Sequence, residues 1–96
     1  MTANQTKITR FLELPLVLVV DDGSYVRTRT FHGVHDEPED LAVTLEWVDP
    51  QGFEWCAEFS EQSLEEAEIE GHRARLLDTC GDKVCLEAYR LLPASV

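Results

Sequence analysis

Two stretches of the chain alternate apolar and polar residues with the period of two that is typical of half-buried β-strands. Each stretch is divided by a tight turn, Asp49-Pro50-Gln51-Gly52 in the first and Asp78-Thr79-Cys80-Gly81 in the second. Proline presets the first turn, and both glycines can take the left-handed conformation that closes a bulged hairpin. The pattern therefore predicts two antiparallel hairpins, each with a defined register.

In the central hairpin, pairing Asp49 with Phe53 gathers the large apolar residues on one face. That face carries Trp47 opposite Trp55, Leu45 opposite Ala57 and Val43 opposite Phe59. The other face carries Val48 with Glu54, Glu46 with Cys56 and Thr44 with Glu58. Because a small domain needs every large apolar side chain it has, we expect the aromatic row to be core; a ligand pocket is the alternative.

In the last hairpin, pairing Asp78 with Asp82 also separates two faces. The apolar face carries Leu76 with Val84, Ala74 with Leu86 and His72 with Ala88. The outer face carries Leu77 with Lys83, Arg75 with Cys85 and Arg73 with Glu87. On this register His72 is expected to be a buried, neutral histidine rather than a catalytic base.

A third hairpin is predicted at Asp21-Asp22-Gly23-Ser24, between the apolar run 14–20 and the segment 25–31. A continuous apolar run is typical of a strand covered on both faces, so we expect it at the centre of a sheet. Before it, Ile8, Phe11 and Leu12 have helical spacing, and Thr6 or Thr9 could cap a short helix. The connector 32–40 carries glycine and proline and is expected to be a loop.

The connector 60–68 contains Ser63-Leu64-Glu65-Glu66, a capping-box spacing that predicts one or two helical turns near 61–67. The expected fold is mainly β, a β-rich α+β domain covering 1–96. It has about six antiparallel strands in three consecutive hairpins, as a small barrel or curved sheet, with a short N-terminal helix. This order of elements resembles the small barrels of the SH3 or Sm type, without a shared motif, and implies no function.

Charge narrows the range of partners. The 96 residues carry a net charge of −11, and no lysine or arginine occurs between Arg29 and Arg73. That interval holds thirteen of the nineteen acidic residues. Because such a field repels phosphates and anionic headgroups, we expect no direct binding to nucleic acid or membranes. A basic protein surface or a cation is the expected partner.

The apolar run 14–20 follows Lys7 and Arg10, as in a secretory signal, but Glu13 enters it and no cleavage pattern follows. It is also shorter than the ~20 residues that span a bilayer. A cytoplasmic location is the expectation.

The carboxylates of the central hairpin are the main candidate site. Glu46, Glu54 and Glu58 share its outer face, where residues two apart on a strand repeat about every 6.8 Å. Glu61, Glu65 and Glu66 extend the charge beyond the strand. Such an array could dock on a basic groove in place of phosphates. The alternative is a solvated face that only keeps the protein soluble.

Metal and thiol chemistry are weaker candidates. His32, His35, Asp36 and Glu37 supply ligand types that zinc accepts, but not the spacing of a known motif, and we expect neither metal nor cofactor. Cys56, Cys80 and Cys85 are an odd number and are expected to be reduced, small half-buried hydrophobes. Glutamates beside Cys56 should raise its pKa, which argues against a nucleophile.

Four arginines, Arg27, Arg29, Arg73 and Arg75, stand in pairs at strand spacing. If their strands are adjacent they form a positive patch, which would allow a homodimer through opposite charges. Arg73 is also expected to pair across strands with Glu87.

The sequence contains no nucleophile with its base and no phosphate-binding glycine loop, so we expect no enzymatic activity. The leading interpretation is a small acidic interaction or inhibitor module that engages a basic partner. Nucleic-acid-binding proteins, blocked by charge mimicry, are included among such partners. The alternatives are a small-ligand or metal-binding domain, using the aromatic face or the histidine loop, and a structural subunit of a larger complex.

Overall fold

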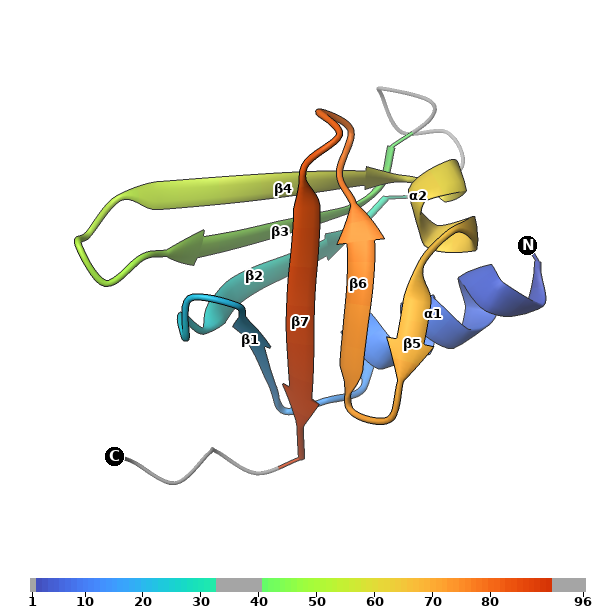
Figure 1. The fold of residues 1–96 in the computed structure, drawn as a ribbon, viewed down its shortest axis with the longest axis horizontal. Coiled ribbons are helices and arrows are strands. Elements are labelled where there is room, and N and C mark those ends of the chain that lie inside the picture. Colours follow the sequence, from blue (N-terminus) through green and yellow to red (C-terminus); the bar gives the residue numbers. More distant parts are fainter. Residues whose placement is uncertain (1, 33–40, 91–96) are drawn as a thin grey trace.

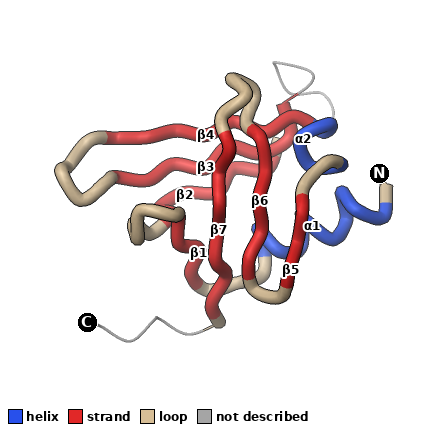
Figure 2. The backbone as a smooth tube through the Cα atoms, in the orientation of Figure 1, coloured by secondary structure: helices blue, strands red, loops and turns tan. Residues whose placement is uncertain are grey.

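The structure, a computed structural model, describes residues 2–32 and 41–90. These residues form a mainly β domain of seven strands in two antiparallel sheets, with two short helices (Figures 1 and 2). In chain order the elements are α1 Ala3–Glu13, β1 Val17–Val20, β2 Val26–Phe31, β3 Leu41–Val48, β4 Glu54–Ser60, α2 Glu61–Glu65, β5 Glu68–Glu70, β6 Arg73–Leu77 and β7 Lys83–Tyr89.

The core lies between the two sheets, whose strand orders are β1-β7-β6-β5 and β2-β3-β4. Strands β3 and β4 run across β6 and β7, and the two helices lie together beside the end of the smaller sheet (Figure 1). Helix α1 contributes Ile8 and Leu12 to a core that also holds Leu18, Leu45 and Phe59, all fully buried. The expected barrel is therefore wrong, because the strands form two separate sheets.

The registers of the two later hairpins are confirmed. Trp47 lies opposite Trp55, and Arg75 lies opposite Cys85, as the side-chain alternation predicts. Both turns form as expected: the Asp49 N–H donates to the Phe53 carbonyl over 2.9 Å, and Gly52 has a φ of 93°. Turn chemistry and alternation agree, which is why these registers can be read from the sequence.

The first hairpin is only partly confirmed. Its turn forms, with the Val20 N–H donating to the Ser24 carbonyl over 2.9 Å, but only one bridge, Val19 to Tyr25, follows. The chain then changes sheets, so that β1 pairs with β7 and β2 pairs with β3. Strand β1 is therefore an edge strand and not a central one. A continuous apolar run indicates that both faces of a strand are covered, but it does not indicate how many neighbouring strands pair with that strand.

Strand β5 is an element that the sequence did not predict, and its first residue, Glu68, falls at the end of the expected connector 60–68. Its three residues, Glu68-Ile69-Glu70, pair with β6 and add a fourth strand to the larger sheet. Two acidic residues around one isoleucine give too short an alternation to predict a strand.

Both helices are predicted, but their N-caps are three or more residues earlier than expected. Thr2 caps α1 in a capping box with Gln5, whereas Thr6 and Thr9 lie inside the helix. Ser60 caps α2 by accepting the Ser63 N–H over 3.1 Å. Several serines and threonines at each end satisfy the capping pattern, so the pattern alone does not select the right one.

Polar side chains fasten the helices to the sheets. The Asn4 side-chain amide donates to the carbonyls of Leu64 and Ala67, over 3.1 and 3.0 Å, where α2 ends. The Arg29 guanidinium, on β2, donates to the carbonyls of Leu12 and Pro15, over 3.1 and 2.7 Å, where α1 ends. The carbonyls of Leu12 and Leu64 belong to the last turns of the helices, where intrahelical donors run out, and those of Pro15 and Ala67 belong to the segments that follow.

Candidate functional site

The turn end of the β3–β4 hairpin projects from the body of the molecule (Figure 1). On its inner face the aromatic row is split: Phe59 is fully buried, whereas Trp55 is 53% and Phe53 is 66% exposed. Trp47, which lies opposite Trp55, is partly buried against the core. The expectation that the whole row is core is therefore wrong for Phe53 and Trp55, because the hairpin is longer than the body it packs against.

Trp55 is exposed but is held in place by a hydrogen bond. Its indole N–H donates to Oδ2 of Asp49 over 2.8 Å, while Oδ1 of Asp49 accepts the backbone N–H groups of Gln51 and Phe53, each over 2.9 Å. The bond from Trp55, with those from the turn, lowers the pKa of Asp49. Sequence reasoning missed this bond; the register, which sets Trp55 close to Asp49, is the signal that could have revealed it.

The outer face of the hairpin carries the predicted acidic residues. Glu46, Glu54 and Glu58 are all exposed on this face, by the register that pairs Glu46 with Cys56 and Thr44 with Glu58. Thr28 on β2 donates its hydroxyl to Glu46 over 2.9 Å. Among residues 2–32 and 41–90, no ion pair involves these three carboxylates. They form one group on two adjacent strands, and within the described residues no arginine forms an ion pair with it.

The other three predicted acids continue this charge at the end of β4. Glu61 and Glu65 lie in α2, Glu66 is its C-cap, and all three are exposed. The register places Glu46, Glu54 and Glu58 alone on one surface, the acidic hairpin face.

Cys56 lies within the acidic hairpin face, exposed between Glu54 and Glu58. Partial burial raises the pKa of its thiol, and the charges of Glu58 and Glu46 raise it further. This direction is the predicted one, and it disfavours a thiolate. The expectation of half-buried cysteines holds for Cys85 and is wrong for Cys56 and Cys80, which are exposed because one is on an outer strand face and the other in a turn.

The four arginines do not form the expected positive patch. Arg27 and Arg29 are on β2, in the smaller sheet, and Arg73 and Arg75 are on β6, in the larger one. Arg75 is 2.9 Å from Glu68, and Arg73 is 4.0 Å from its cross-strand neighbour Glu87. The patch is absent because β2 and β6 belong to different sheets.

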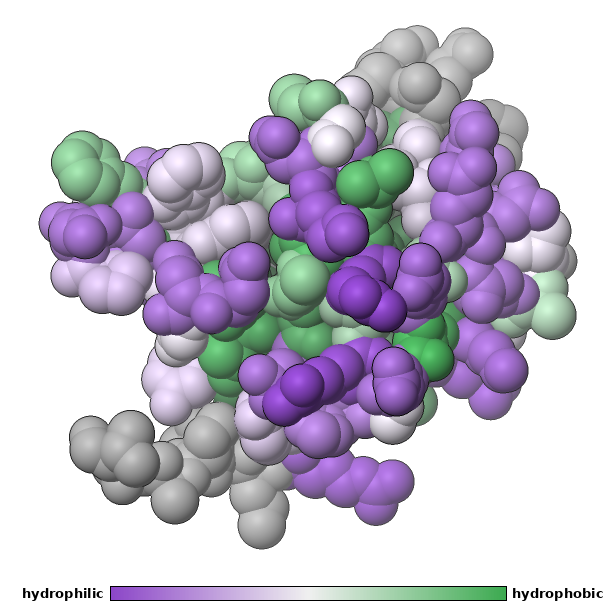
Figure 3. Space-filling model, in the orientation of Figure 1, coloured by the Kyte–Doolittle hydropathy of each residue, from purple (hydrophilic) through white to green (hydrophobic). Residues whose placement is uncertain are grey.

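The outer face of the larger sheet is hollowed, with hydrophilic side chains around a few hydrophobic ones (Figure 3). The hollow has a volume of about 660 Å³, and both carboxylates and guanidinium groups line it, among them Glu68, Arg73, Arg75 and Glu87. Two of its four carboxylates, Glu68 and Glu87, lie against Arg75 and Arg73, so both guanidinium groups of the hollow already have an acidic neighbour and neither is free for an anionic ligand.

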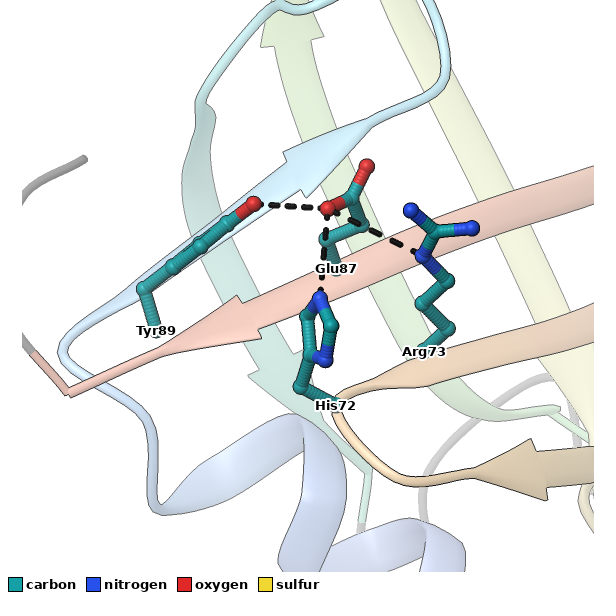
Figure 4. A network of polar contacts seen from close by, with 4 residues as sticks. All are labelled: His72, Arg73, Glu87 and Tyr89. Carbon is teal, nitrogen blue, oxygen red and sulfur yellow. Dashed lines mark hydrogen bonds and ion pairs between the residues drawn. The ribbon is translucent and has the colours of Figure 1, made fainter. Parts of the chain in front are cut away.

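A polar cluster lies at the far end of β7 (Figure 4). Tyr89 donates its hydroxyl to Oε2 of Glu87 over 2.6 Å, and Nε2 of His72 is 3.6 Å from the same oxygen. The bond lowers the pKa of Glu87 and raises that of Tyr89. The His72 side chain is 57% exposed, so its expected burial is wrong: β6 begins at Arg73, and His72 precedes the strand whose alternation would turn it inward.

Of the four candidate metal ligands in the histidine loop, the structure describes one, His32. His35, Asp36 and Glu37 lie outside the described residues, whereas His32 is half-buried with its Nε2 atom 2.8 Å from the Thr44 hydroxyl. Within the described ranges, no group of three or more histidine, cysteine, aspartate or glutamate side chains is placed to hold a metal ion.

No protein-family model, curated protein or solved structure matches this chain. No helix in the described part of the chain is long and apolar enough to cross a membrane.

Proposed function

We propose that this protein is a small interaction module that binds a basic surface of another protein through its β3–β4 hairpin. One observation carries the proposal: a projecting hairpin presents unpaired carboxylates on one face and two exposed aromatic residues, Phe53 and Trp55, on the other. Exposed tryptophan anchors are typical of protein interfaces, and carboxylates on the opposite face of the same hairpin would select a cationic partner.

The distribution of charge also favours the acidic hairpin face as the binding surface. The net charge of −11 gives the molecule a long-range attraction for cations, and the acidic hairpin face concentrates it where no arginine neutralises it. Complementary charge mainly raises the association rate and selects the partner, whereas aromatic contacts slow dissociation. The hairpin offers both kinds of contact on one projecting element.

Nucleic-acid-binding proteins are the partner class that we propose in particular. Their binding grooves are lined by lysine and arginine that hold phosphates, and a regular row of carboxylates can occupy such a groove. A bound module of this kind would act as an inhibitor by excluding the nucleic acid.

The test is capture of partners from a native cell extract at low salt by the immobilised protein. A triple variant, Glu46→Lys, Glu54→Lys and Glu58→Lys, should lose the salt-sensitive partners and keep the circular dichroism spectrum of the parent. The matched control reverses three exposed acids elsewhere, Glu13, Asp21 and Glu70. It changes the net charge equally and should retain capture.

Elution with an oligonucleotide duplex then tests charge mimicry, because a partner held at its nucleic-acid groove is displaced by the duplex at constant salt. Equal capture by the parent and by the hairpin variant would contradict the proposal. Equal loss of partner capture by both triple variants would mean that capture depends on net charge and not on the acidic hairpin face.

A further inference from the structure

Strand β4 is the outermost strand of its sheet, and its backbone has one side turned away from β3. Two hydrogen bonds show which residues of β4 direct their backbone groups toward β3 and which direct them away from it. The Phe53 carbonyl accepts from Asp49, toward β3, whereas the Glu58 carbonyl accepts the Thr79 N–H over 2.8 Å from the β6–β7 turn. Because backbone groups alternate along a strand, Glu54 and Cys56 direct their N–H and C=O groups to the open side.

This open edge has a defined length. In the part of the chain that the structure describes, no hydrogen bond satisfies the outward backbone groups of Glu54 and Cys56. At one end lies the hairpin turn, and at the other the β6–β7 turn covers the edge through Thr79. Unpaired edges of this kind are templates for another strand.

We propose that an extended segment of the partner, with lysine or arginine at alternate positions, binds as an added strand along β4. This inference rests on the proposed function and specifies its geometry. On the outer face a basic side chain opposite Cys56 would lie diagonal to both Glu54 and Glu58, within reach of each carboxylate. On the inner face the intervening side chains would lie beside Trp55. The backbone would supply affinity and the charge pattern would supply specificity.

A second copy of the chain does not fit the same edge. Antiparallel pairing of two β4 strands about Cys56 would set Glu54 of each copy opposite Glu58 of the other. Like charges directly opposite destabilise a strand pair. The acidic hairpin face therefore protects the edge from self-association and selects a basic strand.

The experiment uses a synthetic heptapeptide with lysine at alternate positions and threonine or valine between, blocked at both ends. The control is the same peptide N-methylated at the alternate amides that would face β4, which keeps every charge but removes those donors. We expect at least about tenfold weaker binding of the control, since each lost hydrogen bond contributes roughly 1 kcal/mol. Amide exchange at Glu54 and Cys56 should slow in the complex with the parent peptide alone.

Two variants refine the test. Cys56→Pro removes an N–H that points away from β3, so that the hairpin keeps its ladder, while Cys56→Ala removes the thiol and keeps that N–H. Only the proline variant should bind the unmethylated peptide more weakly than the parent does, because it lacks the Cys56 N–H that would donate to a peptide carbonyl. Should it fail to fold, amide exchange in the parent protein still decides the matter.

Equal binding of both peptides, without protection of Glu54 and Cys56, would overturn strand addition while leaving charge-driven docking intact. Absence of binding by either peptide would also overturn it, and partner capture by the charge-reversed variants would then decide the proposed function separately.

Discussion

The indole N–H of Trp55 donates to the carboxylate of Asp49 over 2.8 Å, joining the exposed aromatic residue to the turn of its own hairpin. Fixing a tryptophan side chain at an interface costs conformational entropy. Because this hydrogen bond already fixes Trp55 in the free protein, less entropy would be lost on binding. The turn residue therefore holds the exposed tryptophan of the proposed docking surface as well as the hairpin.

Replacing Asp49 with asparagine separates these two roles. Asp49→Asn keeps an acceptor for the turn N–H groups at Oδ1, but its amide nitrogen cannot accept from Trp55. We expect the indole N–H resonance of Trp55 to shift, partner binding to weaken and the fold to remain. The Trp47 resonance is the internal control, and an unchanged Trp55 resonance would contradict the assignment.

The same bond predicts a pH dependence. The pKa of Asp49 is lower in the folded state than its ordinary value, with the bond from Trp55 as the main cause. Its stabilising effect is therefore present above the ordinary carboxyl pKa and is lost as the pH falls through the lower folded value. The Trp55 indole resonance, followed from neutral to strongly acidic pH, should show this transition in the parent and not in Asp49→Asn.

Two aromatic residues on one face of β4 should differ sharply in their contribution to stability. Phe59 is fully buried, so Phe59→Ala should lower the free energy of unfolding by about 3–5 kcal/mol, and Phe59→Leu should do so by about 1–2 kcal/mol. Trp55→Ala should change it by no more than about 1 kcal/mol, because the side chain is 53% exposed. Urea unfolding measures all three, and equal losses for the two alanine variants would contradict the split of the aromatic row.

That split shows what the sequence can and cannot predict. The register that puts Trp55 and Phe59 on one face follows from local information, the turn residues and the period of two, and it is correct. Which of the two is buried depends on where the opposite sheet ends. That boundary is set by strands β1, β6 and β7, far away in the chain, and no pattern within the hairpin reports it.

The distinction between local and long-range information also explains the other differences between the predicted and the observed fold. The turn at residues 21–24 is local and was predictable, whereas the change of sheets after it depends on β1 pairing with β7. The acidic residues of the candidate site were predictable for the same reason as the register. The coverage of the β4 edge by Thr79 was not, because it joins two hairpins by a single hydrogen bond.

The cluster at the end of β7 gives a prediction about ionisation. The Tyr89 hydroxyl is the main cause of the lowered pKa of Glu87, so Tyr89→Phe should raise that pKa toward its ordinary value. Glu87→Gln should conversely lower the pKa of Tyr89 toward that of a free tyrosine. Carboxyl carbon shifts and ultraviolet titration measure the two effects. With Tyr25→Phe as control, a Glu87 pKa that responds equally to both tyrosine variants would contradict the assignment.

Arg29 should be the arginine on which the fold depends most. Its guanidinium donates to the carbonyls of Leu12, Pro15 and Leu16, over 3.1, 2.7 and 3.0 Å, and partial burial lowers its pKa. Arg29→Ala leaves these carbonyls without donors and should lower the free energy of unfolding by roughly 1–3 kcal/mol. Arg29→Lys, a single ammonium in place of a planar fork, should have an intermediate effect.

Arg27, exposed on the same strand, is the matched control, and Arg27→Ala should stay within about 0.5 kcal/mol of the parent. Urea unfolding gives the ranking, and amide exchange should show that Arg29→Ala loosens the end of α1 and the segment that joins it to β1 in particular, because the carbonyls it releases lie there. If the two arginines proved equivalent, the guanidinium of Arg29 would not be what joins α1 to β2, and packing of Ile8 and Leu12 against the core would have to hold the helix alone.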